Sequence, residues 1–136
     1  MSFVLDSSVS LAWCFDDERT DAADALLERV VEAGAAAPAL WPLEVLNALA
    51  MAERRSRINA ERRQRLAGFL GDLPVIIDDE TASQAWVATC QLAARFRLTV
   101  YDAAYLELAQ RRGLPLATFD QELRAAAVAL GVTLLG

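Results

Sequence analysis

Four acidic residues, distant from one another in the sequence, each stand where an apolar strand-like segment gives way to a helix. They are Asp6, Glu44, Asp102 and Asp120. Because ligands of parallel sheets bind at the carboxyl ends of the strands, we expect the four side chains to meet in one pocket. Clustered carboxylates repel one another, and they must either take up protons or bind a hard cation. The spacing therefore predicts a Mg²⁺ site and favours a metal-dependent hydrolase.

The composition excludes several other kinds of catalytic site. The chain contains no histidine, which excludes the usual Ser-His-Asp and Cys-His systems and histidine-ligated zinc. All 13 basic residues are arginine, so the P-loop lysine and Schiff-base chemistry are missing as well. The remaining chemistry must come from carboxylates, hydroxyl groups and arginine.

Short apolar segments alternate with longer amphipathic ones along the whole chain. We expect strands at residues 3–5, 35–40, 75–77, 115–118 and 132–135, and helices at residues 9–15, 16–33, 42–57, 60–70, 80–95, 102–112 and 120–130. This alternation predicts an α/β fold, a three-layer α/β/α sandwich with a mainly parallel sheet of about five strands. A single domain over residues 1–136 suits the length and the high apolar fraction.

Each of the four acids also has a simpler structural explanation. Asp6, Asp102 and Asp120 are all placed to cap the N-terminus of a helix, where aspartate is a preferred residue. Glu44 lies in an apolar segment, where a carboxylate needs a partner, but an exposed glutamate in a first helical turn is also favoured by the helix dipole. It is the joint placement of the four acids that favours a metal site.

Positive charge is concentrated in one part of a chain that carries a formal net charge of -6. Six of the thirteen arginines lie within residues 54–65: Arg54, Arg55, Arg57, Arg62, Arg63 and Arg65. The acidic balance argues against indiscriminate binding of polyanions, although such a cluster can contact phosphates locally. A solvated helix surface paired with nearby acids, or a contact for an acidic protein, explains the cluster equally simply.

Two cysteines and the absence of long apolar segments bear on the environment of the protein. Cys14 and Cys90 match no metal-binding or redox spacing, and we expect both to be buried free thiols. No signal segment and no apolar stretch long enough to cross a bilayer is recognised. A cytoplasmic protein without membrane contact is therefore expected.

Four segments carry the four acids in order along nearly the whole chain. They read FVLDSSVSLAW, LWPLEVLNAL, TVYDAAYLELAQRRG and PLATFDQEL. Together they resemble the PIN domain family, specifically the VapC-type toxin ribonucleases of bacterial toxin–antitoxin modules. The resemblance implies an endoribonuclease that uses Mg²⁺ or Mn²⁺ and leaves a 5′-phosphate and a 3′-hydroxyl. It also implies a homodimer and a VapB-type antitoxin whose tail blocks the active-site groove.

The same resemblance assigns roles to individual residues. It implies that the four acids are catalytic and bind the metal, Asp120 either directly or through a water molecule. Ser7 and Thr118 match hydroxyl positions near the pocket, and Ser7 is expected to steady Asp6 or a bound water, or to cap a helix. Asn47, one turn after Glu44, is expected to orient that carboxylate. Arg54, Arg55 and Arg57 are candidates for contacts with flanking RNA phosphates.

Two other functions remain open from the sequence. The first keeps the metal site but acts on branched DNA, as flap-type nucleases of this architecture do, although their additional DNA-binding segments have no room here. The second is a non-catalytic scaffold in which the acids only cap helices. The aromatic residues Trp13, Phe15, Trp41 and Trp86 are either partner contacts or core, and we expect at least half of them in the core.

Overall fold

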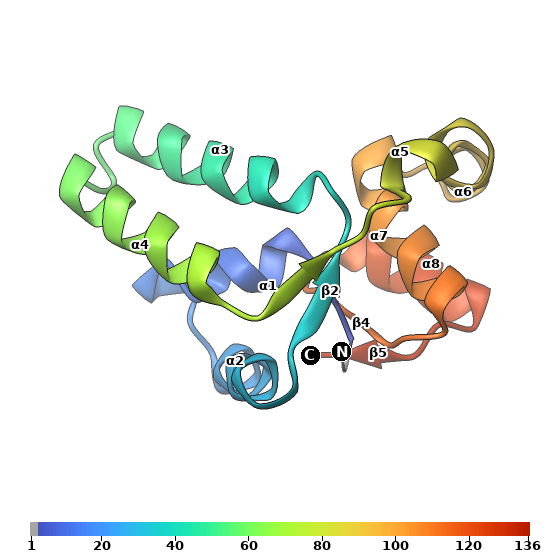
Figure 1. Cartoon of the computed structure of the whole chain (residues 1–136), viewed down its shortest axis with the longest axis horizontal. Helices are drawn as coiled ribbons and strands as arrows, with labels where there is room; N and C mark the ends of the chain where they lie inside the picture. The colour runs from blue at the N-terminus through green and yellow to red at the C-terminus, as the bar shows by residue number, and fades with distance from the viewer. Residues whose placement is uncertain (1–2) are drawn as a thin grey trace.

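A five-stranded sheet lies at the centre of the computed structural model, which describes residues 3–136 (Figure 1). The strands are β1 (Val4–Leu5), β2 (Ala35–Ala37), β3 (Val75–Ile77), β4 (Leu116–Ala117) and β5 (Leu134–Leu135). Their order across the sheet is β3-β2-β1-β4-β5, and every neighbouring pair is parallel. Because β1 is the central strand, the residue that follows it lies at the middle of one sheet edge.

Helices cover both faces of the sheet. They are α1 (Ser7–Ala12), α2 (Asp21–Ala33), α3 (Trp41–Arg54), α4 (Ala60–Asp72), α5 (Thr81–Gln84), α6 (Cys90–Phe96), α7 (Val100–Arg112) and α8 (Gln121–Leu130), with a 3-10 turn η1 (Asp16–Glu18) and a π-helical turn η2 (Ala85–Thr89). Figure 1 shows α1 to α4 on one side of the sheet and α5 to α8 on the other. The predicted three-layer α/β/α fold is confirmed.

The core encloses β1 and the middle of α7. Phe3, Val4 and Leu5 are fully buried, as expected for a strand covered on both faces. In α7 all seven residues from Ala103 to Ala109 are buried, so this helix is enclosed by the rest of the protein. A helix held in this way places its first turn, which contains Asp102, rigidly beside the sheet.

Several predicted boundaries are shifted for identifiable reasons. The helix expected from residue 16 begins at Asp21, because the Thr20 side chain caps it by accepting a hydrogen bond from the Ala23 amide at 3.0 Å. The strand expected to reach residue 40 ends at Ala37, since Pro38 has no amide to donate to a neighbouring strand. The helix expected at residues 80–95 is interrupted by the π-helical turn η2.

Cysteine and tryptophan burial is only partly as predicted. Cys14 is buried, but Cys90 is exposed, so the prediction of two buried thiols is wrong for Cys90. Trp13 and Trp41 lie in the core, as does Phe15, whereas Trp86 is 85% exposed. At least half of the aromatic set is therefore core, as expected. Among the described residues, no helix is both long and apolar enough to cross a membrane.

Candidate active site

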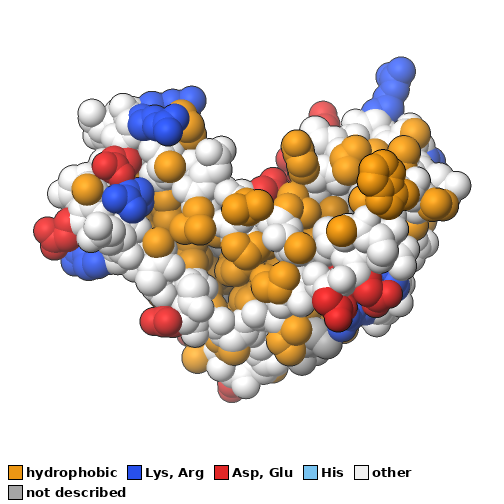
Figure 2. Space-filling model, turned by 45° about the horizontal axis from the view of Figure 1, so that its top comes forward, with side chains coloured by type: hydrophobic (Ala, Val, Ile, Leu, Met, Phe, Trp, Pro, Cys, Tyr) orange, Lys and Arg blue, Asp and Glu red, His pale blue; other side chains and the backbone are white. Residues whose placement is uncertain are grey.

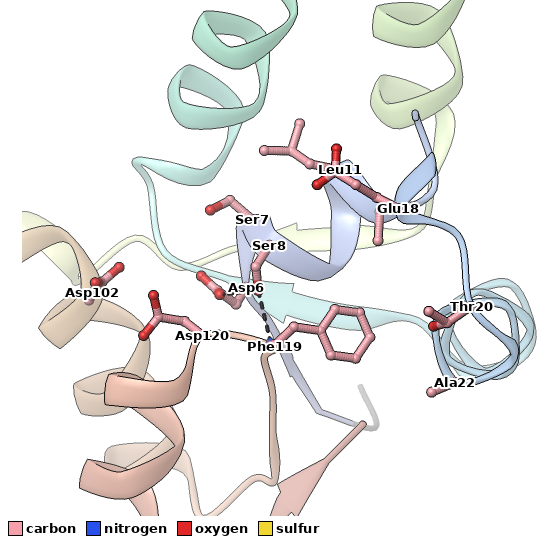
Figure 3. A pocket seen from close by; sticks show the side chains of 11 residues that line it. Asp6, Ser7, Ser8, Leu11, Glu18, Thr20, Ala22, Asp102, Phe119 and Asp120 are labelled. Carbon is pink, nitrogen blue, oxygen red and sulfur yellow. Dashed lines mark hydrogen bonds between the residues drawn. The ribbon is translucent and has the colours of Figure 1, made fainter. Parts of the chain in front are cut away.

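A cavity of about 790 Å³ opens at the carboxyl ends of the central strands. Asp6 follows β1, Asp120 comes shortly after β4, and Asp102 lies in the first turn of α7. All three line the cavity, and Figure 3 shows their side chains grouped at one end of it. Glu44, in the first turn of α3, is half-buried and does not line the cavity itself.

Asp6 is the most buried of the four acids, with 3% of its surface exposed. One of its carboxylate oxygens, Oδ2, accepts hydrogen bonds from Ser8 Oγ at 2.6 Å and Thr118 Oγ1 at 2.7 Å. Burial raises the pKa of Asp6 above its ordinary value, although these hydrogen bonds lower it. Both hydroxyl groups bind the same oxygen, so the carboxylate is held in one orientation.

The hydroxyl that holds Asp6 comes from Ser8, not from Ser7 as the sequence suggested. The Ser7 side chain instead lies near Glu44 and Tyr105, where it lowers the pKa of both. Thr118 is placed as expected beside the acids, since its hydroxyl donates to Asp6. Sequence spacing cannot separate two adjacent serines, because which one faces the acid depends on how α1 turns away from β1.

Glu44 is fixed by a residue that the sequence did not point to. The hydroxyl of Tyr105, whose side chain is fully buried in α7, donates a hydrogen bond to Glu44 Oε1 at 2.5 Å. Asn47, the expected partner, is exposed, and no hydrogen bond joins it to Glu44. Burial raises the pKa of Glu44, and the negative charges of Asp6 and Asp102 raise it further against the effect of the Tyr105 bond.

The pKa of Asp102 is raised in the same way as that of Glu44. Burial raises its pKa, and the charges of Asp6 and Asp120 raise it further. It does not cap its helix, because the cap of α7 is Thr99, whose hydroxyl accepts a hydrogen bond from the Asp102 amide at 3.1 Å. The negative charge of Asp6 therefore raises the pKa of both Glu44 and Asp102.

Of Asp6, Asp102 and Asp120, the three candidate helix caps, one caps a helix with its side chain. Asp6 occupies the N-cap position of α1 without making a side-chain capping bond. Asp120 does cap α8, since its Oδ1 accepts a hydrogen bond from the Leu123 amide at 2.9 Å. Its position on the cavity wall leaves the second oxygen of Asp120 for other contacts.

A tighter group of carboxylates lies elsewhere. Between residues 3 and 136, the one set of three acids whose oxygens all fall within 4.8 Å of one another is Asp78, Asp79 and Glu80; the four predicted acids are spaced more widely. Asp78 is bound by Arg111 at 2.6 Å and by Arg112 at 3.2 Å. Burial alone would raise the pKa of Asp78, but the hydrogen bonds from Arg111 and Thr81 lower it below its ordinary value. Asp78 and Glu80 are already paired with arginine, unlike Asp6, Asp102 and Asp120 at the cavity.

A family comparison agrees with this fold. The PIN domain family model matches residues 3–129. The chain belongs to the PIN domain family. The match spans all four predicted acids, Asp6, Glu44, Asp102 and Asp120. No curated protein matches the chain.

Solved structures show the same PIN fold. The crystal structure of PAE2754 from Pyrobaculum aerophilum is 25% identical, with a TM-score of 0.69 over 93% of this chain and 86% of that one. FitAcB from Neisseria gonorrhoeae is 16% identical, with a TM-score of 0.69 over 98% of this chain and 96% of that one. VapBC2 from Rickettsia felis, bound to a DNA fragment from their promoter, is 12% identical, with a TM-score of 0.70 over 98% and 97%. The last two likenesses show the fold alone.

The arginines expected near the PIN site differ in availability. Arg57 is engaged within the protein, since its Nη2 lies 2.7 Å from Asp17 and 3.2 Å from Glu18. It ties the turn after α3 to η1, and we no longer expect it to contact RNA. Arg54 and Arg55 are exposed at the end of α3. They are the two members of the predicted set that face solvent without an ion pair among the described residues.

Proposed function

We propose that this PIN domain is a Mg²⁺- or Mn²⁺-dependent endoribonuclease, the toxin of a type II VapBC toxin–antitoxin pair. The observation that carries the proposal is the buried Asp6 carboxylate, held by two hydroxyl groups and facing the charges of Glu44 and Asp102. Carboxylates placed so that the charge of one raises the pKa of its neighbours form a strong site for a hard cation. A chain without histidine or lysine offers neither an imidazole nor an amine as general base for phosphodiester hydrolysis.

The donor set fits such an ion chemically. Mg²⁺ and Mn²⁺ prefer oxygen ligands, and Asp6, Glu44, Asp102 and Asp120 supply only carboxylate oxygens. When bound, the ion supplies Lewis acidity, neutralising charge on the scissile phosphate and acidifying a water molecule. The protein contributes rigidity: Ser8 and Thr118 fix Asp6, and Tyr105 fixes Glu44.

The partner proposals rest on the family and on exposed apolar surface. The crystal structures of FitAcB and VapBC2 support a VapB-type antitoxin as partner. Figure 2 shows hydrophobic side chains along the hollow between helices α3 and α4 on one side and helices α5 and α6 on the other. Leu43 and Leu46 on α3 are 72% and 45% exposed. Apolar surface of this kind suits contact with another protein. We also propose a homodimer, for which light scattering of the purified chain is the test.

Purified protein incubated with three nucleic acids separates the candidate functions. RNA, single-stranded DNA and flap DNA are each incubated with Mn²⁺ or with a chelator. Cleavage of RNA alone, lost with the chelator, supports the proposal. Cleavage of flap DNA supports the DNA nuclease, and no cleavage of any substrate supports the scaffold. Sequencing the 5′-ends produced in total cellular RNA after brief induction then identifies the RNA that is cut.

Divalent metal is expected to stabilise the protein, and more so at high pH. The folded-state pKa values of Asp6, Glu44 and Asp102 are raised, so the folded state binds more protons than the unfolded state. The metal-free protein therefore loses stability as pH rises from about 4 through those raised values. A metal at one hundred times its Kd adds about 2.7 kcal/mol. Thermal melts with and without Mg²⁺ should differ more at about pH 8 than at about pH 5. An equal or absent shift contradicts a preformed carboxylate site.

Tyr105→Phe is expected to weaken metal binding by about tenfold or more, because residues that orient metal ligands typically contribute this much. The substitution removes only the hydroxyl that donates to Glu44 and keeps the buried ring. Calorimetric titration with Mn²⁺ measures the effect. Tyr101→Phe is the matched control, since Tyr101 lies on the same helix and is 64% exposed. Equal affinity in both variants rules out a positioning role for Tyr105.

A further inference from the structure

The cavity extends well beyond the acidic residues. Asp6, Asp102 and Asp120 occupy one end, and the other end is lined by Leu11, Glu18, Thr20, Ala22 and Phe119. Figure 3 shows the Phe119 ring pointing away from the acids, toward Thr20 and Ala22. The volume of about 790 Å³ lies within the range of roughly 300–1,000 Å³ that is usual for small-molecule sites. The acids alone do not account for a cavity of this length.

Phe119 is held in place by the same group that holds Asp6. Its backbone amide donates a hydrogen bond to Ser8 Oγ at 3.0 Å, and Ser8 Oγ in turn donates to Asp6 at 2.6 Å. On its other side the ring lies against Gly136, where an added Cβ would come within 3.0 Å of Phe119 Cε1. The ring is therefore half-buried, and the backbone that carries it is joined through Ser8 to Asp6 at the acidic end. Such preorganisation suits stacking of a flat ligand.

Polar groups stand at the far end of the cavity. Glu18 is held by Arg57, whose Nη2 lies 3.2 Å from its Oε2, and the structure gives no hydrogen bond to Oε1. Thr20 Oγ1 accepts from the Ala23 amide, which leaves its hydroxyl hydrogen to donate elsewhere. An acceptor and a donor that line the same cavity as an aromatic ring are suited to read the polar edge of a nucleobase.

We propose that the Phe119 end of the cavity binds the nucleobase of the nucleotide whose phosphate lies at the acidic end. Phe119 stacks on the base, Leu11 forms an apolar wall, and Glu18 and Thr20 contact its polar edge. The proposal rests on the proposed nuclease function, since it needs a phosphate at Asp6 and Asp102. It makes the enzyme a reader of one unstacked base, which restricts the substrate to single-stranded or looped RNA.

Binding of 5′-AMP and of ribose 5-phosphate in the presence of Mg²⁺ tests this subsite. The two probes share the sugar and the 5′-phosphate, and only 5′-AMP has a base. Wild type is expected to bind 5′-AMP more tightly by about tenfold or more, because stacking on an aromatic side chain contributes this much. Phe119→Leu should remove that preference and leave ribose 5-phosphate affinity unchanged. The control is Phe69→Leu, a half-buried phenylalanine on α4 outside the cavity, which should keep the preference.

The outcomes separate the subsite from the nuclease proposal. Equal affinity of wild type for the two probes contradicts the base subsite but leaves phosphate binding at the acids intact. Preference retained in Phe119→Leu also contradicts it, and places the base elsewhere. Failure of both probes to bind overturns the subsite together with its phosphate site. The nuclease proposal is tested separately, by the assay of RNA cleavage.

Discussion

Asp6→Asn is expected to lower the rate of RNA cleavage by about 10²- to 10³-fold, because it removes the most buried carboxylate of the proposed metal site. The fold should survive, since an asparagine oxygen can still accept the hydrogen bonds from Ser8 and Thr118. The pKa of Asp6 is raised, which means that its charge destabilises the metal-free folded state. In a chelator at neutral pH the variant should therefore melt at the same temperature as wild type or above it.

Loss of cleavage without loss of stability distinguishes Asp6 from a residue that only supports the fold. Single-turnover cleavage and a chelator melt measure the two quantities on the same sample. Asp79→Asn is the matched control, since Asp79 is an exposed acid in the group with Asp78 and Glu80, and its loss should leave cleavage unchanged. Retained cleavage in Asp6→Asn, or loss of cleavage in Asp79→Asn, contradicts the assignment of the site.

Arg111→Met is expected to lower the free energy of unfolding by about 3–5 kcal/mol, the cost of breaking a buried ion pair by removing one partner. Arg111 binds Glu107 at 2.7 Å and Asp78 at 2.6 Å, and the side chains of these acids are 5% and 1% exposed. After the substitution Asp78 keeps Arg112, but Glu107 loses the one ion-pair partner it has among the described residues. A buried carboxylate is then left uncompensated inside the core.

Urea unfolding measures that loss, with an exposed pair as the comparison. Arg19 and Asp24 form a salt bridge at 2.8 Å with both side chains 47% exposed. Arg19→Met should therefore change stability by at most about 1 kcal/mol. A similar loss of unfolding free energy in the two variants contradicts the claim that the ion pairs of Arg111 stabilise the fold. These pairs join α7 to Asp78, the residue that follows β3.

The strands and the gathering of acids follow from the sequence because both obey rules of local pattern and topology. A short apolar run that precedes Asp6 must be a buried strand, and parallel strands place their carboxyl ends at one edge. That reasoning also indicated that Glu44 needs a partner in its apolar surroundings. The partner is Tyr105, which is 61 residues away in the sequence.

What the sequence could not supply is contact between distant elements. Asn47 was expected to orient Glu44 because spacing along one helix is all that a sequence displays, but α7 brings Tyr105 closer. Arg57 was expected to be available for RNA, yet η1 carries the acids that bind it. The π-helical turn η2 and the exposure of Cys90, which directly follows it, were likewise not predicted from the sequence.

The central claim is that the carboxylates at the ends of β1 and β4, with those of α3 and α7, share a divalent ion. The most direct test is an anomalous difference map from a crystal soaked in Mn²⁺. We predict a peak among Asp6, Glu44 and Asp102 that disappears in Asp6→Asn. A peak at Asp78, Asp79 and Glu80 instead, or no peak at any acid, would contradict the claim.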